Sequence, residues 1–317
     1  MDYATLYANQ GFFVLRGILA AEEVMRLRNV VYDYMERGGR LVSTHAFGNH
    51  GGWFAGGVHL EHALRDAVSL IDGKARLHAA LESVLGSGRV ARNNDDDQRM
   101  NKRTNPSVPR SYRMLSRNEI YIDRYGTWHS DTVIGAYSRY TPPSLTPCRR
   151  AFGCLWDPLP GGGPIREREY GVATVATYLE PHENDTQALH VKPRTHVSDV
   201  AQRNGVKRRS GAHDADGMVL HPRLGDIIVF DTRLVHRGQD EAYANLRKDR
   251  TFRAADRHRG LLALTYGRHN AFSESHDRAF AMRNQLVSNK SLCGGQWMSK
   301  CALSAMERDL KENPLLG

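Results

Sequence analysis

The chain of 317 residues has few cysteines and no long apolar run, and both absences narrow what it can be. The four cysteines, Cys148, Cys154, Cys293 and Cys301, form no CxxC pair, so they predict neither a disulfide framework nor a zinc ribbon, and we interpret them as idle or buried thiols. No apolar run approaches the roughly 20 residues that cross a bilayer. The first residues also lack the basic-then-apolar layout of a secretory signal. We therefore expect a cytoplasmic protein with no membrane partner.

Basic residues outnumber acidic ones, but they are not clustered in the sequence. The formal net charge is +9, from 44 Lys and Arg against 35 Asp and Glu. The basic residues are scattered, most clusters carry acids beside them, and no RNP-like aromatic motif, Cys/His finger or basic heptad accompanies them. This pattern indicates a solvated surface and no nucleic-acid partner, while a second interpretation assigns some arginines to an anionic substrate.

The first third of the chain has helical periodicity. A short amphipathic segment breaks at Gly11 and enters a β-like run at 12–15. Apolar residues recur at helical spacing over 20–36, with acids in the first turn, and a second helical stretch is expected over 59–85. Residues 92–110 are polar and lack periodicity, which predicts an exposed loop.

Strand-like runs dominate from about residue 112. They are NEIYIDRY, YGVATVATYL, ALHVKP, DIIVFDTRLVH and GLLALTYG, separated by turns. A Pro/Gly-rich stretch between 140 and 170 is long enough to predict a lid or binding loop. The succession predicts a mainly β fold with supporting helices, built as an antiparallel double-sheet barrel. We expect one domain over 1–317, with helical support and a loop in 1–110, the barrel in 111–270 and C-terminal helices in 271–317.

The motif TWHSDT places His129 and Asp131 two residues apart, so both side chains project from one face of a strand. His236, which closes the apolar run DIIVFDTRLVH, supplies a third ligand. Two histidines and one carboxylate form the facial triad of non-haem iron(II) oxygenases, which leaves three positions for a co-substrate and dioxygen. Among 15 histidines an HxD also arises by chance, and a lone histidine is more often a hydrogen-bonded structural residue. Spacing alone therefore leaves both interpretations open.

Four motifs in order resemble the phytanoyl-CoA dioxygenase family, which includes ectoine hydroxylase. QGFFVLRGILAAEEVMRLR is similar to the family's N-terminal strand and helix, and WHSD to its metal-binding HxD. ATYLEPHENDTQALHVKPRTH resembles the stretch that ends in a Pro-Gly-Ser-His-like sequence, although Gln187 stands where glycine is usual. LHPRLGDIIVFDTRLVH is similar to the strand that carries the distal histidine, and GLLALTYG to the next strand. The similarity covers about 8–37 and 118–267.

The resemblance implies a double-stranded β-helix core (a jelly roll, cupin-like) that binds Fe(II), with 2-oxoglutarate and O2 as co-substrates. It implies His129, Asp131 and His236 as the metal ligands. It also implies an arginine whose guanidinium fork binds the distal carboxylate of 2-oxoglutarate. The match is Arg259, just before LLALTYG. Arg257, with the same strand parity, ranks second and Arg247, in a loop-like stretch, ranks third.

The family often has a hydroxyl two residues past the distal histidine, where this chain has Gly238. Asn118 or Tyr121, on the strand before HxD, is expected to compensate by binding 2-oxoglutarate. The other histidines near the motifs, His182, His190, His196 and His221, are interpreted as structural.

The expected reaction is oxidation of an aliphatic C–H with release of succinate and CO2, as hydroxylation, desaturation or oxidative cyclisation, in small-molecule or natural-product metabolism. The substrate is expected to be a small molecule, carboxylate-bearing or amino-acid-like, because arginines gather near the presumed mouth, although surface arginines for solubility explain them equally. The alternatives are a metal-dependent, non-oxidative cupin enzyme and a non-catalytic binding barrel. The candidate substrate-binding residues are Arg139, Arg149, Arg150, Arg166, Arg168 and Arg194.

Overall fold

A computed structural model of the chain describes its helices, most of its strands and the turns next to them. The described residues are 2–36, 42–43, 53–56, 65–86, 110–122, 131, 170–181, 189–196, 217–238, 260–270, 273–274 and 276–277. The elements are α1 (Tyr3–Gln10), β1 (Phe12–Leu15), α2 (Ala21–Glu36), β2 (Val42–Ser43), β3 (Trp53–Gly56), α4 (Arg65–Asp72), α5 (Ala75–Leu85), β4 (Tyr112–Ile122), β5 (Val172–Tyr178), β6 (Leu189–Lys192), β7 (Met218–Leu220), β8 (Ile227–Asp231), β9 (Val235–Arg237) and β10 (Gly260–Arg268).

Most of the strands form one large antiparallel sheet. Its order is β1-β8-β5-β10-β4-β3-β2, so strands far apart in the sequence lie side by side. The N-terminal strand β1 pairs with β8, with Phe12 opposite Phe230 and Leu15 opposite Ile227. Because β1 covers β8, the strand that leads to His236 lies inside the sheet, with a partner on each side.

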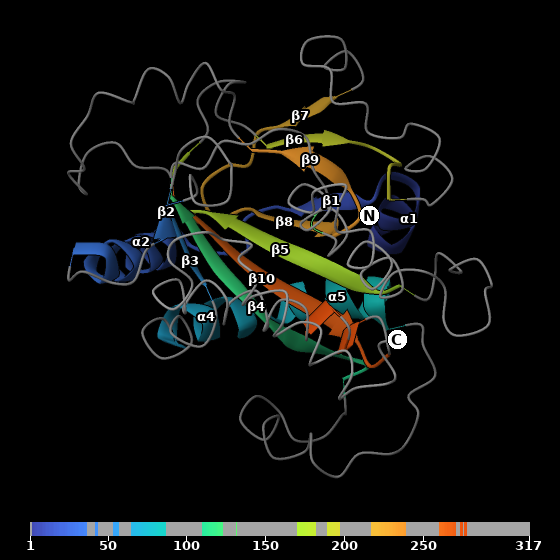
Figure 1. Cartoon of the computed structure of the whole chain (residues 1–317), viewed down its shortest axis with the longest axis horizontal. Helices are drawn as coiled ribbons and strands as arrows, with labels where there is room; N and C mark the ends of the chain where they lie inside the picture. Colours follow the sequence, from blue (N-terminus) through green and yellow to red (C-terminus); the bar gives the residue numbers. More distant parts are fainter. Residues whose placement is uncertain are drawn as a thin grey trace, which may run out of the picture.

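A small antiparallel sheet, in the order β7-β6-β9, lies over one face of the large sheet (Figure 1). A buried cluster fills the space between them. Phe12, Ile228 and Phe230 come from the large sheet, and Leu189 and Val191 from the small one. The two sheets therefore pack face to face through apolar side chains.

The helices pack on the opposite face of the large sheet (Figure 1). A second buried cluster joins Leu27 of α2 and Leu81 of α5 to Val175 and Leu264 of the sheet. Both faces of the sheet are thus covered. For this reason all residues of β8, and all but the last residue of β5, are buried, and buried residues do not alternate with exposed ones along these strands.

Several expectations from the sequence are confirmed along the N-terminal segment. The first helix ends at Gly11, which adopts a left-handed φ of 85°, and β1 follows it directly. The helix expected over 20–36 is α2. Four of the five strand-like runs correspond to β5, β6, β8 with β9, and β10, and the run NEIYIDRY covers only the second half of β4.

The helical stretch expected over 59–85 is helical where the structure describes it, from residue 65 on, but it consists of two helices, α4 and α5. The amide of Gly73 ends α4 by donating to the carbonyl of Ser69, at 2.8 Å. Lys74 is extended, with φ −83° and ψ 107°, so the chain changes direction before α5 begins. Apolar periodicity did not reveal the break, since both helices contribute buried apolar side chains to the same cluster.

The turn before β8 is tied to the end of β1. Gly225 has a φ of 86°, and its carbonyl accepts hydrogen bonds from the amides of Ile18 and Leu19 at 2.9 and 3.0 Å. The buried carboxylate of Asp226 accepts from the amide of Gly17 at 2.9 Å. The Gly-Asp dipeptide therefore fixes where β8 begins.

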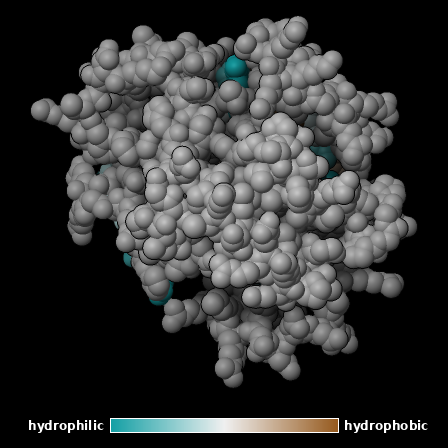
Figure 2. All heavy atoms as spheres, viewed as in Figure 1, coloured by the Kyte–Doolittle hydropathy of each residue, from teal (hydrophilic) through white to brown (hydrophobic). Residues whose placement is uncertain are grey.

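In the described part of the chain, no helix is long and apolar enough to span a membrane. The large apolar side chains that are exposed there, Met25, Met218 and Leu224, belong to three separate elements or turns. On the face shown in Figure 2, the described side chains that reach the surface are mostly hydrophilic.

Candidate metal centre

His236 lies on β9, in the small sheet, and faces the space between the two sheets. In the register of β6 and β9 it stands opposite Val191, which belongs to the buried cluster between the sheets. Directly opposite residues of an antiparallel pair share a face. The imidazole is 6% exposed, and its ring centroid lies 4.9 Å from that of Phe230 on the large sheet.

Asp131 is brought to His236 by the loop between β8 and β9. The amide of Asp131 donates to the carbonyl of Thr232 at 2.8 Å. Its carboxylate Oδ2 lies 3.6 Å from Nε2 of His236, and the side chain is as buried as that of the histidine. Two of the three predicted ligands therefore meet, although they are far apart in the sequence.

The tautomer of His236 follows from its other ring nitrogen. Nδ1 lies 2.9 Å from the carbonyl oxygen of Leu234. A carbonyl only accepts, so Nδ1 carries the proton, and in the neutral ring the lone pair lies on Nε2. Metal-ligating histidines are oriented in this way, by a second hydrogen bond to a carbonyl or carboxylate.

The two possible ligand atoms, Oδ2 of Asp131 and Nε2 of His236, lie near each other without a hydrogen bond between them. At 3.6 Å, the oxygen and nitrogen lie beyond ordinary hydrogen-bonding distance. Two ligand atoms that are each about 2.1 Å from one ion lie about 3.0 Å apart at a right angle and about 3.4 Å apart at a tetrahedral angle. The observed 3.6 Å is slightly wider than either value, and the ligand types, one carboxylate oxygen and one imidazole nitrogen, suit a divalent transition metal.

The third predicted ligand, His129, lies outside the described residues. Within the part of the chain that the structure describes, no group of three His, Cys, Asp or Glu side chains is gathered for a metal. Most of the predicted arginines also fall outside it. The residues concerned are Arg259, Arg257, Arg247, Arg139, Arg149, Arg150, Arg166 and Arg168, together with His182.

Asn118 and Tyr121 point to opposite faces of the large sheet. Asn118 stands opposite Leu264, which packs against the helices, and its amide nitrogen lies 3.5 Å from the sulfur of Met114. Tyr121 stands opposite Leu261, which borders the cluster between the sheets. Of the two, only Tyr121 lies on the side of the sheet that faces His236.

The hydroxyl of Tyr121 donates to the carboxylate of Glu119, a fully buried residue two positions earlier on the same face. A phenol has a single proton to donate. With its proton donated to Glu119, the Tyr121 oxygen can only accept a further hydrogen bond. In this arrangement it has no proton to donate to the carboxylate of 2-oxoglutarate.

Three of the histidines interpreted as structural, His190, His196 and His221, lie within the described residues. His196 has Nε2 3.2 Å from the carbonyl of Ala8 and its ring against Gly11. His190 stands opposite Arg237, so it projects from the other face of the small sheet than His236. The carbonyl of His221 accepts from Arg16 at 3.4 Å.

Arg194, the one described member of the predicted substrate-binding arginines, occupies an exposed turn after β6. It has a φ of 70°, and its amide donates to the carbonyl of Gln10 at the end of α1, at 3.0 Å. The backbone of this residue thus joins the turn to α1.

The carbonyls of Thr232 and Leu234 were not predicted from the sequence, because a backbone oxygen leaves no residue-type signal. Each orients one of the two ligands, the first through the amide of Asp131 and the second through the ring of His236. The sequence could have indicated these two residues only by their position, because both lie in the short turn between the apolar run and the distal histidine.

Comparisons with known proteins identify no family. No family model and no curated protein matches the chain. Among solved structures, the non-heme α-ketoglutarate-dependent epimerase SnoN from nogalamycin biosynthesis is 14% identical, with a TM-score of 0.49, over 84% of this chain and 79% of that one. The carbocyclase SnoK from the same biosynthesis is 12% identical, with a TM-score of 0.48, over 84% and 83%.

HygX from Streptomyces hygroscopicus, solved with nickel and 2-oxoglutarate bound, is 14% identical, with a TM-score of 0.48, over 84% of this chain and 85% of that one. These structural neighbours are non-haem, 2-oxoglutarate-dependent or 2-oxoglutarate-binding proteins. Likeness this distant assigns no activity to the present chain.

Proposed function

We propose that the protein is an Fe(II)- and 2-oxoglutarate-dependent oxygenase that oxidises an aliphatic C–H of a small molecule. The observation that carries the proposal is the meeting of the Asp131 carboxylate and the Nε2 of His236 at a buried point between the two sheets. The proton on Nδ1 of the histidine leaves Nε2 as the donor atom for the metal.

We further propose that the two sheets are the halves of a double-stranded β-helix, or jelly roll. The order of strands along the chain supports this. β4 and β5 lie in the large sheet, β6 and β7 in the small one, β8 in the large, β9 in the small and β10 in the large. A chain that crosses repeatedly between two facing antiparallel sheets is the architecture that the term describes.

His129 is the proposed third ligand. It precedes Asp131 by two residues, so in an extended segment the two side chains project to the same side. When bound, the iron supplies the site at which 2-oxoglutarate and dioxygen react, with succinate and CO2 as products. His129, Asp131 and His236 would supply the protein's ligands to the ion, and its remaining positions would be left to 2-oxoglutarate and dioxygen.

Arg259 is the proposed partner of the distal carboxylate of 2-oxoglutarate. Leu261 and Ala263 stand opposite Tyr178 and Ala176, whose face borders the space between the sheets. Arg259 has the same odd-numbered alternation along the chain, immediately before β10. Its guanidinium fork binds a carboxylate through two parallel hydrogen bonds, a geometry that a lysine cannot reproduce.

The surroundings of His236 favour the exclusion of water. Phe230, Val191 and Leu234 are buried in the cluster between the sheets. An apolar shell of this kind keeps solvent from a reactive intermediate. For the substrate, the proposal is a small carboxylate-bearing or amino-acid-like molecule in natural-product metabolism, recognised by the arginines named above.

Anaerobic addition of Fe(II) and then 2-oxoglutarate tests the proposal. Chelation of the keto acid by iron gives a weak visible charge-transfer band. We expect the band in the wild-type protein and its loss in His129→Ala, Asp131→Ala and His236→Ala. His190→Ala is the matched control, because that side chain faces away from His236, and it should retain the band.

Two results would contradict the proposal. A wild-type protein that binds Fe(II) but gives no band with 2-oxoglutarate would favour a metal-dependent, non-oxidative enzyme of the same architecture. A band that persists in His236→Ala would remove this residue from the metal site. If the band is found, oxygen consumption with a panel of small carboxylates and amino acids, followed by product mass, identifies the substrate.

A further inference from the structure

A buried ion pair lies in the loop that joins β8 to the strand of His236. The guanidinium of Arg233 donates to both carboxylate oxygens of Asp231, from Nε at 2.9 Å and from Nη2 at 2.8 Å. The amide of Arg233 donates to the same carboxylate at 2.8 Å. The Asp231 side chain is 2% exposed and that of Arg233 15% exposed. The carboxylate of Asp231 therefore accepts three hydrogen bonds from one residue, Arg233.

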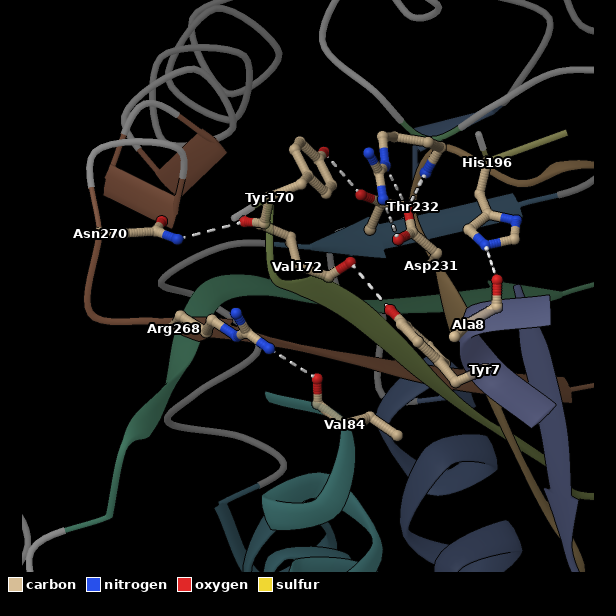
Figure 3. A network of polar contacts seen from close by, with 11 residues as sticks. Tyr7, Ala8, Val84, Tyr170, Val172, His196, Asp231, Thr232, Arg268 and Asn270 are labelled. Carbon is tan, nitrogen blue, oxygen red and sulfur yellow. Dashed lines mark hydrogen bonds and ion pairs between the residues drawn. The ribbon is translucent and has the colours of Figure 1, made fainter. Parts of the chain in front are cut away.

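Tyr170 lies between this ion pair and the side chain of Thr232, and its hydroxyl points to the Thr232 hydroxyl (Figure 3). The Arg233 guanidinium lies over the Tyr170 ring, 4.4 Å from its centroid. The Tyr170 hydroxyl lies 2.7 Å from the hydroxyl of Thr232, and the whole tyrosine is buried. Burial alone would lower the pKa of the Arg233 guanidinium, but the charge of Asp231 and the hydrogen bonds to it outweigh burial and raise that pKa, so the guanidinium stays charged.

The loop held by these side chains carries both hydrogen-bond acceptors of the candidate metal centre. The carbonyl of Thr232 accepts from the amide of Asp131, and the carbonyl of Leu234 accepts from Nδ1 of His236. The loop backbone is itself fixed, since the amide of Leu234 donates to the carbonyl of Asp231 at 2.9 Å. A shift of this loop would move both ligands at once.

We infer that Asp231, Arg233, Tyr170 and Thr232 form a positioning cluster that sets the orientation of Asp131 and His236. The inference rests on the proposed function. A buried ion pair adds little net stability compared with apolar packing, and its best-attested use is to fix one geometry. Mutation of the groups that hydrogen-bond to metal ligands changes metal affinity or activity about tenfold to a hundredfold in other metal sites, so we expect an effect at the lower end of this range from residues that hold such groups in place.

Equilibrium binding of Co(II), followed by its visible absorption and by calorimetry, tests the cluster without any turnover. Tyr170→Phe removes only the hydroxyl and keeps the ring under Arg233. Thr232→Val removes the partner hydroxyl and keeps the side-chain shape, while Thr232→Ser restores it. We expect about tenfold weaker Co(II) binding in the first two variants and near wild-type binding in Thr232→Ser.

Tyr266→Phe is the matched control for buried hydroxyl loss. Its hydroxyl donates to Asp72 at 2.9 Å, and Tyr266 packs in the cluster on the helix side of the sheet. Both tyrosine variants, Tyr170→Phe and Tyr266→Phe, should lose some thermal stability, but only Tyr170→Phe should bind Co(II) more weakly than the wild type. Arg233→Lys, which keeps the charge without the fork, should also weaken Co(II) binding.

The results separate this inference from the proposed function. Wild-type affinity for Co(II) in both Tyr170→Phe and Thr232→Val would overturn the positioning role and leave the proposed function standing. A wild-type protein that does not bind Co(II) would overturn the metal centre itself, and the positioning role with it. If Tyr170→Phe does not fold, the comparison of Thr232→Val with Thr232→Ser decides.

Discussion

Single residues decide the conformation of several turns next to the candidate site. Gly11 ends α1 with a φ of 85°, and an added Cβ would lie 2.5 Å from Nδ1 of His196 and 2.9 Å from a methyl of Leu234. Gly17 also has a positive φ, 59°, but an added Cβ there meets nothing within 4 Å. An alanine at Gly17 would therefore introduce backbone strain alone, whereas an alanine at Gly11 would introduce backbone strain and steric overlap.

Gly11→Ala should destabilise the protein by more than Gly17→Ala. The left-handed conformation alone costs a non-glycine residue about 1–2 kcal/mol, which is the expectation for Gly17→Ala. Gly11→Ala adds overlap with buried neighbours, so we expect about 3 kcal/mol or more. Urea denaturation measures both variants, and equal losses would show that His196 and Leu234 move aside freely.

Asp226 tests which contacts of a buried carboxylate matter. It accepts from the amides of Gly17 and Arg223 at 2.9 and 2.8 Å, and from the guanidinium of Arg16. Asp226→Ala leaves two amides without their acceptor and should cost about 2–3 kcal/mol in the free energy of unfolding. Arg16→Ala removes a guanidinium whose side chain is 59% exposed, and should cost under about 1 kcal/mol. A larger loss in Arg16→Ala than in Asp226→Ala would contradict this assignment.

Among the elements, the corner between α4 and α5 is attached to the sheet through Asp72. Its carboxylate accepts from the hydroxyl of Tyr266 on β10 at 2.9 Å and lies 3.3 Å from Nε2 of His78 on α5. Burial alone would raise the pKa of Asp72, but the hydrogen bond and charge of His78, with smaller contributions from Tyr266 and Arg110, lower it below the ordinary value.

This lowered pKa predicts a contribution to stability that depends on pH. The carboxylate is more acidic in the folded state than in the unfolded state, so its contribution is complete above the unfolded pKa, about 3.9. It is lost as the pH falls through the lower, folded value. Asp72→Asn should therefore be less stable than the wild type at neutral pH, with the difference shrinking toward about pH 3. A difference that stays constant across this range in urea titrations would contradict the prediction.

The predictability of each element depended on how much of its environment is local. The end of α1, the helix α2 and the strands β5, β6, β8, β9 and β10, with the second half of β4, were recognisable, because caps, acids and apolar runs lie within a few residues of one another. The division of 59–85 into two helices was not, since its cause is the extended Lys74 and the closing amide of Gly73. The short strands β2, β3 and β7 were also missed, because pairing with neighbours defines them rather than composition.

In the whole molecule, the candidate metal centre brings together two residues that are far apart in the sequence and belong to different parts of the fold. His236 belongs to β9 in the small sheet, while Asp131 lies between β4 and β5 in the sequence, both of which are in the large sheet. A metal bound by both residues links these parts in the folded state alone. Ligand binding should therefore raise the stability of the entire fold.

Co(II) with 2-oxoglutarate should raise the free energy of unfolding of the wild-type protein by about 2.7 kcal/mol at ligand concentrations a hundredfold above the dissociation constant. Asp131→Ala and His236→Ala should show no such rise, because each removes a ligand atom. Thermal unfolding followed by tryptophan fluorescence measures the effect. An equal rise in His236→Ala would place the bound metal elsewhere.

The sequence by itself determined the residue types of the site and their local spacing: the HxD pair two residues apart, the late histidine at the end of an apolar run, and the Gly-Asp turn before it. These features can be recognised from the sequence because each depends only on residues that are neighbours along the chain. The tertiary structure alone decided that Asp131 and His236 meet at 3.6 Å, that Asn118 and Tyr121 face opposite ways, and that carbonyls of one loop orient both ligands. Such facts depend on strand order and register, which are set by the burial of both sheets at once and not by any one segment.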